Sequence, residues 1–165
     1  MLVIGIDPGL ATTGYGLVRK NAEVLQAVDY GYIGTPAHTD LSERLYMIFS
    51  DLRKLLEEYS PDAMAVEQLF FAKNTRTALN VGEARGAILT AAAQKGIPVY
   101  EYTPLQVKQT IAGYGRADKK QVQQMVRILL KLEETPKPDD VADALAIAIS
   151  HIQAAAWHKL VGRRP

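Results

Sequence analysis

The 165-residue chain contains no cysteine. This absence excludes disulfide bonds and zinc sites built from thiolates, and it is typical of a protein from a reducing compartment such as the cytoplasm. No apolar run approaches the roughly 20 residues that cross a bilayer. The first apolar run, LVIGID at 2–7, has no basic residue before it and ends in an acid. We therefore expect neither a signal peptide nor a membrane span.

Repeats, low-complexity tracts and Ser/Gly linkers are also absent. Hydrophobic residues make up 48% of the chain and charged residues 22%, which is typical of a folded soluble protein. A chain of this length suits one domain with one sizeable core. We expect a single domain over residues 1–165.

The net charge is only +1, but the charges are distributed unevenly. Residues 72–132 hold ten Lys and Arg against three acids, a segment charge of +7, and the remainder carries −6. Such a division indicates one basic face, suited to a polyanion, and one acidic region. Solvated helix surfaces are the plainer interpretation, and charge alone does not separate the two.

Apolar patterning predicts the order βββαβαβ followed by three helices. Short apolar runs predict five strands at 2–7, 14–20, within 23–33, 63–67 and 97–102. Helical periodicity and capping signals predict helices at 41–59, 75–95, from Thr103-Pro104, 118–131 and from Asp140. An antiparallel meander that feeds alternating strands and helices predicts an α/β fold, a mixed five-stranded sheet flanked by helices.

Two local features carry further expectations. Asp40 and Glu43 have the spacing of a capping box at the start of the first helix. Gly82 and Gly86 lie four residues apart on one face of the second helix, where each glycine costs about 1 kcal/mol relative to alanine. Close approach of another element, from this chain or from a second subunit, would offset that cost.

The last helix, PDDVADALAIAIS at 138–150, is apolar nearly all round yet contains Asp143. A buried, unpaired carboxylate costs several kcal/mol, so Asp143 needs a basic partner, backbone N–H groups or a cation. Asp140 lies three residues earlier and projects from the same helix face. Helix capping explains Asp139 well, but it explains Asp143 poorly because that residue lies a full turn inside.

Two more acids follow predicted interior strands. Asp7 ends LVIGID and Glu67 ends AMAVE at 63–67, and ligands gather at such strand ends. Each acid alone could be an ordinary turn or loop residue. Together with Asp140 and Asp143 they are explained most simply by a shared cation. Oxygen ligands favour Mg²⁺ or Mn²⁺, and four carboxylates suit the two ions used in phosphoryl displacement.

The chain resembles the bacterial RuvC Holliday junction resolvases over nearly its whole length. Four blocks carry the resemblance: IGIDPGLATTGYG (4–16), AVEQLFFAKNTRTALNVGEARGAI (65–88), YTPLQVKQTIAGYGRADKKQVQQMV (102–126) and DDVADALAIAI (139–149). The resemblance implies a ribonuclease-H-like fold and a homodimeric endodeoxyribonuclease of recombination and repair. It also implies two Mg²⁺ ions, with Mn²⁺ as a substitute, 5′-phosphate and 3′-hydroxyl ends, and the RuvA/RuvB branch-migration helicase as partner.

By the same resemblance, Asp7, Glu67, Asp140 and Asp143 are the catalytic, metal-binding acids, and Lys119 lies near the scissile phosphate. Phe70 falls on a base-stacking position, although aromatic pairs such as Phe70 and Phe71 usually belong to a core. The predicted DNA-binding residues are Phe70, Phe71, Lys73, Arg76, Lys108, Arg116, Lys119 and Lys120. Without the resemblance, Lys119 would be assigned to a solvated helix surface.

Three other functions stay open at this point. DPGLATTG at 7–14 also resembles the phosphate-binding turn of actin-like ATPases and sugar kinases, which need two such domains and a longer chain. A non-catalytic junction-binding protein and a nuclease acting on another structured nucleic acid are the other two. Tests of ATP binding, metal-dependent cleavage and substrate choice distinguish them.

Overall fold

The computed structural model describes residues 1–68 and 75–160 of the chain. At its centre is a mixed sheet in the order β3-β2-β1-β4-β5. The strands are β1 (Leu2–Asp7), β2 (Thr12–Asn21), β3 (Val24–Gly34), β4 (Ala63–Glu67) and β5 (Val99–Tyr102). β1, β2 and β3 form an antiparallel meander, whereas β4 runs parallel to both β1 and β5. The predicted mixed five-stranded sheet is confirmed.

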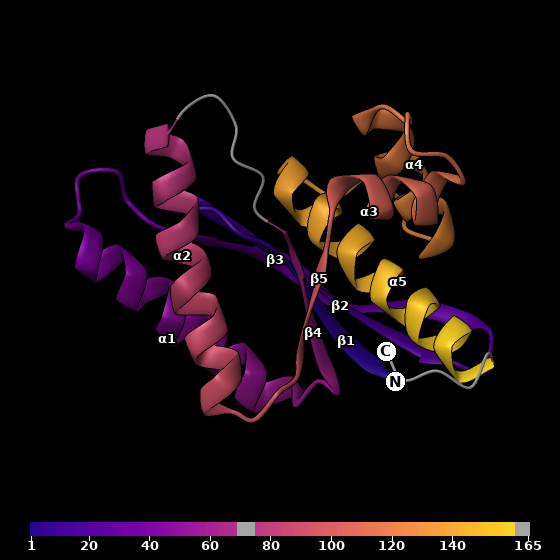
Figure 1. Ribbon diagram of the computed structural model, residues 1–165, viewed down its shortest axis with the longest axis horizontal. Helices are drawn as coiled ribbons and strands as arrows, with labels where there is room; N and C mark the ends of the chain where they lie inside the picture. The colour runs from indigo at the N-terminus through magenta and orange to yellow at the C-terminus, as the bar shows by residue number, and fades with distance from the viewer. Residues whose placement is uncertain (69–74, 161–165) are drawn as a thin grey trace.

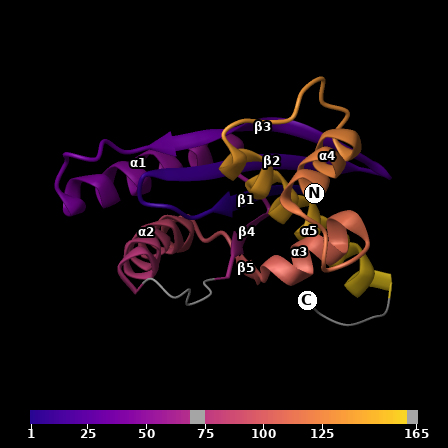
Figure 2. The same cartoon turned by 90° about the horizontal axis from the view of Figure 1, so that it is seen from above.

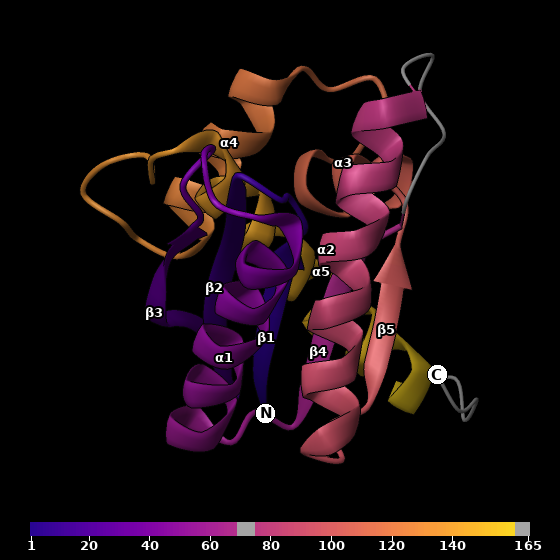
Figure 3. The same ribbon diagram turned by 90° about the vertical axis from the view of Figure 1, so that its left-hand side faces the viewer.

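Helices cover both faces of this sheet. They are α1 (Leu41–Tyr59), α2 (Thr75–Gln94), α3 (Pro104–Ala112), α4 (Lys119–Leu129) and α5 (Asp139–Leu160). Figure 1 shows α1 and α2 on one side and α3, α4 and α5 on the other, and Figures 2 and 3 show the same layers from above and from the side. Alternate residues of β1 serve the two faces: Ile4 and Ile6 pack with α1 and α2, and Val3 packs with α5.

Three helices begin with the residue spacing of a capping box, and in two of them the box forms. Thr103 and Asp118 each accept a hydrogen bond from the backbone N–H three residues later, and a glutamine at that position returns it. The expected box at Asp40 is wrong, because the Asp40 side chain makes no capping hydrogen bond.

α5 is the helix that joins the core to the candidate site. It lies along β1 and β2 (Figure 1), and its residues from Val141 to Ile152 are buried apart from partly exposed Asp143. Its apolar character therefore reflects packing beneath α3 and α4 and on the sheet. Among the residues that the structure describes, no helix is long and apolar enough to cross a membrane.

The second glycine of α2 has open space beside it. α2 packs against α1, yet a Cβ built on Gly86 would meet no described atom within 4 Å beyond its chain neighbours and the adjacent backbone of its own helix. Within the described part of the chain, close packing therefore does not account for this glycine.

Candidate active site

Two of the predicted acids lie at the ends of neighbouring parallel strands. Asp7 ends β1, Glu67 ends β4, and Ile6 lies opposite Val66 in the register. Carboxyl ends of adjacent parallel strands meet at one edge of a sheet, so the two side chains lie close together. Both are only partly exposed.

Glycines on β1 and β2 bring the start of α5 to the same edge. Asp7 pairs with Gly14 across the sheet, and a Cβ on Gly14 would overlap the carbonyl of Asp140. A turn further along, a Cβ on Gly5 would overlap the carbonyl of Ala144. α5 thus rests directly on the sheet backbone, and this close approach places its acids above Asp7.

We expect Gly5→Ala to lower the free energy of unfolding by about 3 kcal/mol, because the new methyl must push α5 off the sheet. Urea denaturation would measure the change. Gly34→Ala is the matched strand control, since the nearest atom to its added Cβ lies at 3.4 Å, an ordinary contact. Equal stability of the two variants would contradict the assigned packing.

The four acids influence one another electrostatically. Burial raises the pKa of Asp7, and the charges of Glu67, Asp143 and Asp140 raise it further, to about 8. Burial, and then the charge of Asp143, also raises the pKa of Glu67. The pKa of Asp143 is raised by burial even though Lys119 opposes the shift. Residues far apart in the sequence therefore form one cluster of carboxylates that is crowded with negative charge.

Lys119, the first residue of α4, is the basic partner of this cluster. Its Nζ lies 3.0 Å from Asp143 Oδ2 and 3.3 Å from Asp139 Oδ2. Burial alone would lower the pKa of Lys119, but hydrogen bonds and charges from Asp143 and then Asp139 outweigh burial and raise it. Asp139 is the first residue of α5. It was predicted to cap the helix, and its ion pair with Lys119 was not predicted.

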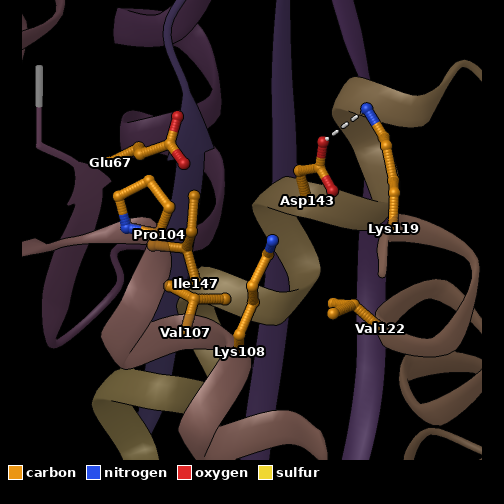
Figure 4. Close-up of a pocket in the computed structure, with 8 residues that line it drawn as sticks. All are labelled: Glu67, Pro104, Val107, Lys108, Lys119, Val122, Asp143 and Ile147. Atoms are coloured by element: carbon orange, nitrogen blue, oxygen red, sulfur yellow. Dashed lines mark ion pairs between the residues drawn. The ribbon is translucent and has the colours of Figure 1, made fainter. Parts of the chain in front are cut away.

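A pocket of about 190 Å³ opens between β4, α3, α4 and α5. Four charged and four apolar residues line it: Glu67, Lys108, Lys119, Asp143, Pro104, Val107, Val122 and Ile147. Figure 4 shows Lys108 reaching from α3 into the space between Glu67 and Asp143, with Lys119 on the far side of Asp143. The apolar residues form the wall from which these charged groups project.

The donor atoms suit a hard cation. Asp7, Glu67, Asp140 and Asp143 offer only carboxylate oxygens, the ligands that Mg²⁺ and Mn²⁺ prefer. In the described residues, however, no three acids or histidines already enclose a single point as a cation site. Asp143 is paired with Lys119 in this structure. The residues fit divalent cations by the chemistry of their oxygens and by the crowding of negative charge around Asp7.

The other predicted DNA-binding residues divide into two groups. Arg116 and Lys120 are exposed near the start of α4, beside Lys119 but outside the pocket lining. Phe70, Phe71 and Lys73 lie outside the described residues, as does the side chain of Arg76.

Sequence reasoning missed the apolar half of the pocket and the role of Asp139. Val107, Val122 and Ile147 look like ordinary core residues in the sequence, and only the meeting of three helices places them at the pocket. The Lys119–Asp139 pair leaves no local signal, because twenty residues separate its members.

Comparisons with known proteins agree with this geometry. A family model described as "Crossover junction endodeoxyribonuclease RuvC" matches residues 3–151. A curated protein of that name from Desulfitobacterium hafniense is 62% identical over 151 residues, which cover 92% of each chain. Its counterpart from Moorella thermoacetica is 57% identical over 159 residues, covering 96% of this chain and 95% of the relative.

Solved structures give the same result. The structure described as "T. thermophilus RuvC in complex with Holliday junction substrate" superposes with a TM-score of 0.91 and 42% identity, covering 95% of this chain and 96% of that chain. The yeast mitochondrial Holliday junction resolvase Ydc2 has a TM-score of 0.70 at 16% identity, covering 96% of this chain and 82% of its own, and shows likeness of fold alone. The expected ribonuclease-H-like fold is confirmed.

Proposed function

The chain belongs to the RuvC family of crossover junction endodeoxyribonucleases, and we propose that it resolves Holliday junctions. It nicks two opposing strands symmetrically by hydrolysis, leaving 5′-phosphate and 3′-hydroxyl ends, and so serves homologous recombination and DNA repair. The observation that carries this proposal is the carboxylate cluster of Asp7, Glu67, Asp140 and Asp143 beside Lys119 at one edge of the sheet.

In this proposal Asp7 is the central ligand, because it is influenced by all three other acids. Glu67 holds the β4 side, and Asp140 and Asp143 hold the α5 side. Two Mg²⁺ ions bound there, for which Mn²⁺ would substitute, would lower the pKa of water and neutralise charge on the reacting phosphate. Lys119, which pairs with Asp143 in this structure, would stabilise negative charge on the scissile phosphate.

The DNA approaches across the basic residues around the pocket. Lys108 projects into it, and exposed Arg116 and Lys120 flank it. We assign phosphate contacts to these three and to Lys73 and Arg76, and base contacts at the junction centre to Phe70 and Phe71. Each phosphate contact contributes to affinity and to its salt dependence without adding sequence preference.

A junction presents two equivalent strands, so we propose a twofold dimer that supplies two sites in matching orientation. The exposed side of α2 is the proposed contact, because Leu79 there is 62% exposed and Gly86 has open space beside it. Transfer of the junction from the RuvA/RuvB branch-migration helicase completes the proposed pathway.

Gly86→Ala tests the dimer contact. Within one chain the change should stabilise α2 by up to about 1 kcal/mol, since alanine favours helix and nothing described lies near the new methyl. Between two closely packed helices the methyl would instead hold the subunits apart. We expect sedimentation equilibrium to show a dimer weakened about tenfold or more. An unchanged dimer with a higher melting temperature would place the contact elsewhere.

The function is tested by incubating the protein with a mobile four-way junction and Mg²⁺ and mapping the nicks. We expect paired nicks at symmetric positions and none with EDTA. Duplex, flap and RNA–DNA hybrid substrates in parallel test for a nuclease of different specificity. Junction binding without any cleavage would support the non-catalytic alternative, and ATP binding would support the actin-like one.

A further inference from the structure

A buried histidine lies on α5, four residues beyond the pocket residue Ile147 and outside the set of proposed ligands. His151, on α5, is 2% exposed. Its Nδ1 lies 2.9 Å from the Tyr102 hydroxyl oxygen. Its ring also lies against that of Tyr100, tilted by 32° with ring centroids 4.3 Å apart, and Tyr102 meets it edge-on at 5.9 Å. Both tyrosines belong to β5, the edge strand of the sheet on this side.

Tyr102 connects three parts of the site: the end of β4, the start of α3 and α5. In the register it lies opposite Glu67, and its carbonyl accepts a hydrogen bond of 2.8 Å from the Gln68 N–H. α3 begins two residues later at Pro104 and carries Lys108 into the pocket. The backbone of Tyr102 therefore belongs to the Glu67 side of the pocket, and its side chain is tied to the helix that carries Asp143.

The hydrogen bond is uncharged. Burial lowers the pKa of His151 and raises that of Tyr102 to about 12, so both rings are neutral at physiological pH. A neutral imidazole has one nitrogen that can accept, and the phenol O–H donates to it. Because the histidine is buried, water cannot readily replace this bond when it is lost.

We propose that the Tyr102–His151 hydrogen bond is a positioning contact. It holds the end of β4, which carries Glu67, at a fixed distance from α5, which carries Asp143. This inference rests on the proposed function, since it matters only where both acids must reach the same cations. Neither Tyr102 nor His151 touches the substrate. They act through the ends of β4 and β5, through the start of α3 and through α5.

Tyr102→Phe is the direct test, because it removes one hydroxyl and keeps the aromatic packing. Tyr100→Phe is the matched control: it makes the same change two residues away against the same imidazole. In the described part of the chain, the Tyr100 hydroxyl forms no hydrogen bond with His151. We expect Tyr102→Phe to slow single-turnover junction cleavage by about tenfold to a hundredfold with junction affinity unchanged, since small misplacements of reacting groups have such effects. Tyr100→Phe should cleave like the wild type.

A readout that needs no cleavage is the Mg²⁺ concentration at which half of the thermal stabilisation by the ion is reached. We expect this midpoint to rise about tenfold in Tyr102→Phe and to stay unchanged in Tyr100→Phe. His151→Asn, whose amide can reach the place of Nδ1, should retain more cleavage than His151→Leu. All four variants should melt well above the assay temperature.

Equal losses in the two tyrosine variants, or none in either, would overturn the positioning role. A wild type that fails to cleave junctions would refute the proposed function, and the Mg²⁺ midpoints would still test the positioning contact. If Mg²⁺ stabilises no form of the protein, the contact has no cation site to position and the inference is wrong.

Discussion

Asp7→Asn is expected to lower the rate of junction cleavage at least about a thousandfold while junction affinity changes less than about twofold. Asp7 lies at the centre of the cluster, because Glu67, Asp143 and Asp140 all act on its pKa. Replacing its carboxylate by an amide would remove the central one of the four carboxylates that would hold the cations, and metal-assisted hydrolysis depends on bound cations. The basic residues that hold DNA phosphates are untouched, so binding should persist.

Single-turnover cleavage and binding in Ca²⁺ measure the two quantities separately. The control is Asp62→Asn, the same chemical change near the opposite end of β1, where the carboxylate accepts a 2.7 Å hydrogen bond from the Leu2 N–H. An asparagine oxygen can accept the same bond, so Asp62→Asn should cleave at the wild-type rate. Loss of binding in parallel with cleavage in Asp7→Asn would assign Asp7 a structural role instead.

The element order and the gathering of acids could be read from the sequence because both follow from local patterns. Apolar runs of strand length end in Asp7 and Glu67, and a uniformly apolar helix contains Asp143. Burial of charge is costly wherever the rest of the chain lies, so the need for a partner was predictable without knowing the fold. The helix starts predicted at Thr103-Pro104 and at Asp118 were similarly local.

What could not be predicted depends on contacts between distant segments. Gly5 and Gly14 read as ordinary strand glycines until α5 is seen to rest on them. The choice of Lys119 as the partner of Asp143 depends on how α4 packs against α5. The failed box at Asp40 shows the limit of motif spacing, since the spacing was present but the Asp40 side chain makes no capping hydrogen bond.

The raised pKa of Asp7 predicts an unusual dependence of stability on pH in the absence of divalent cations. The folded protein binds this proton up to pH about 8, whereas the ordinary value is 3.8. Between these values the folded state holds more proton than the unfolded chain, so the stability of the wild type falls as pH rises, by about 1.4 kcal/mol per pH unit for one group. Asp7→Asn lacks this proton and should show a flatter profile.

We therefore expect Asp7→Asn to be more stable than the wild type at pH 8 without metal, by several kcal/mol, and the difference to shrink steadily toward pH 5. Urea unfolding in EDTA at a series of pH values would measure it. Mg²⁺ should restore stability to the wild type at pH 8 and do little for Asp7→Asn, because the cation neutralises the charge that the mutation removes. Parallel pH profiles for the two proteins would mean that the fold does not raise the pKa of Asp7. The proposed cluster, in which acids costly to the fold are kept for the cations they bind, would then be wrong.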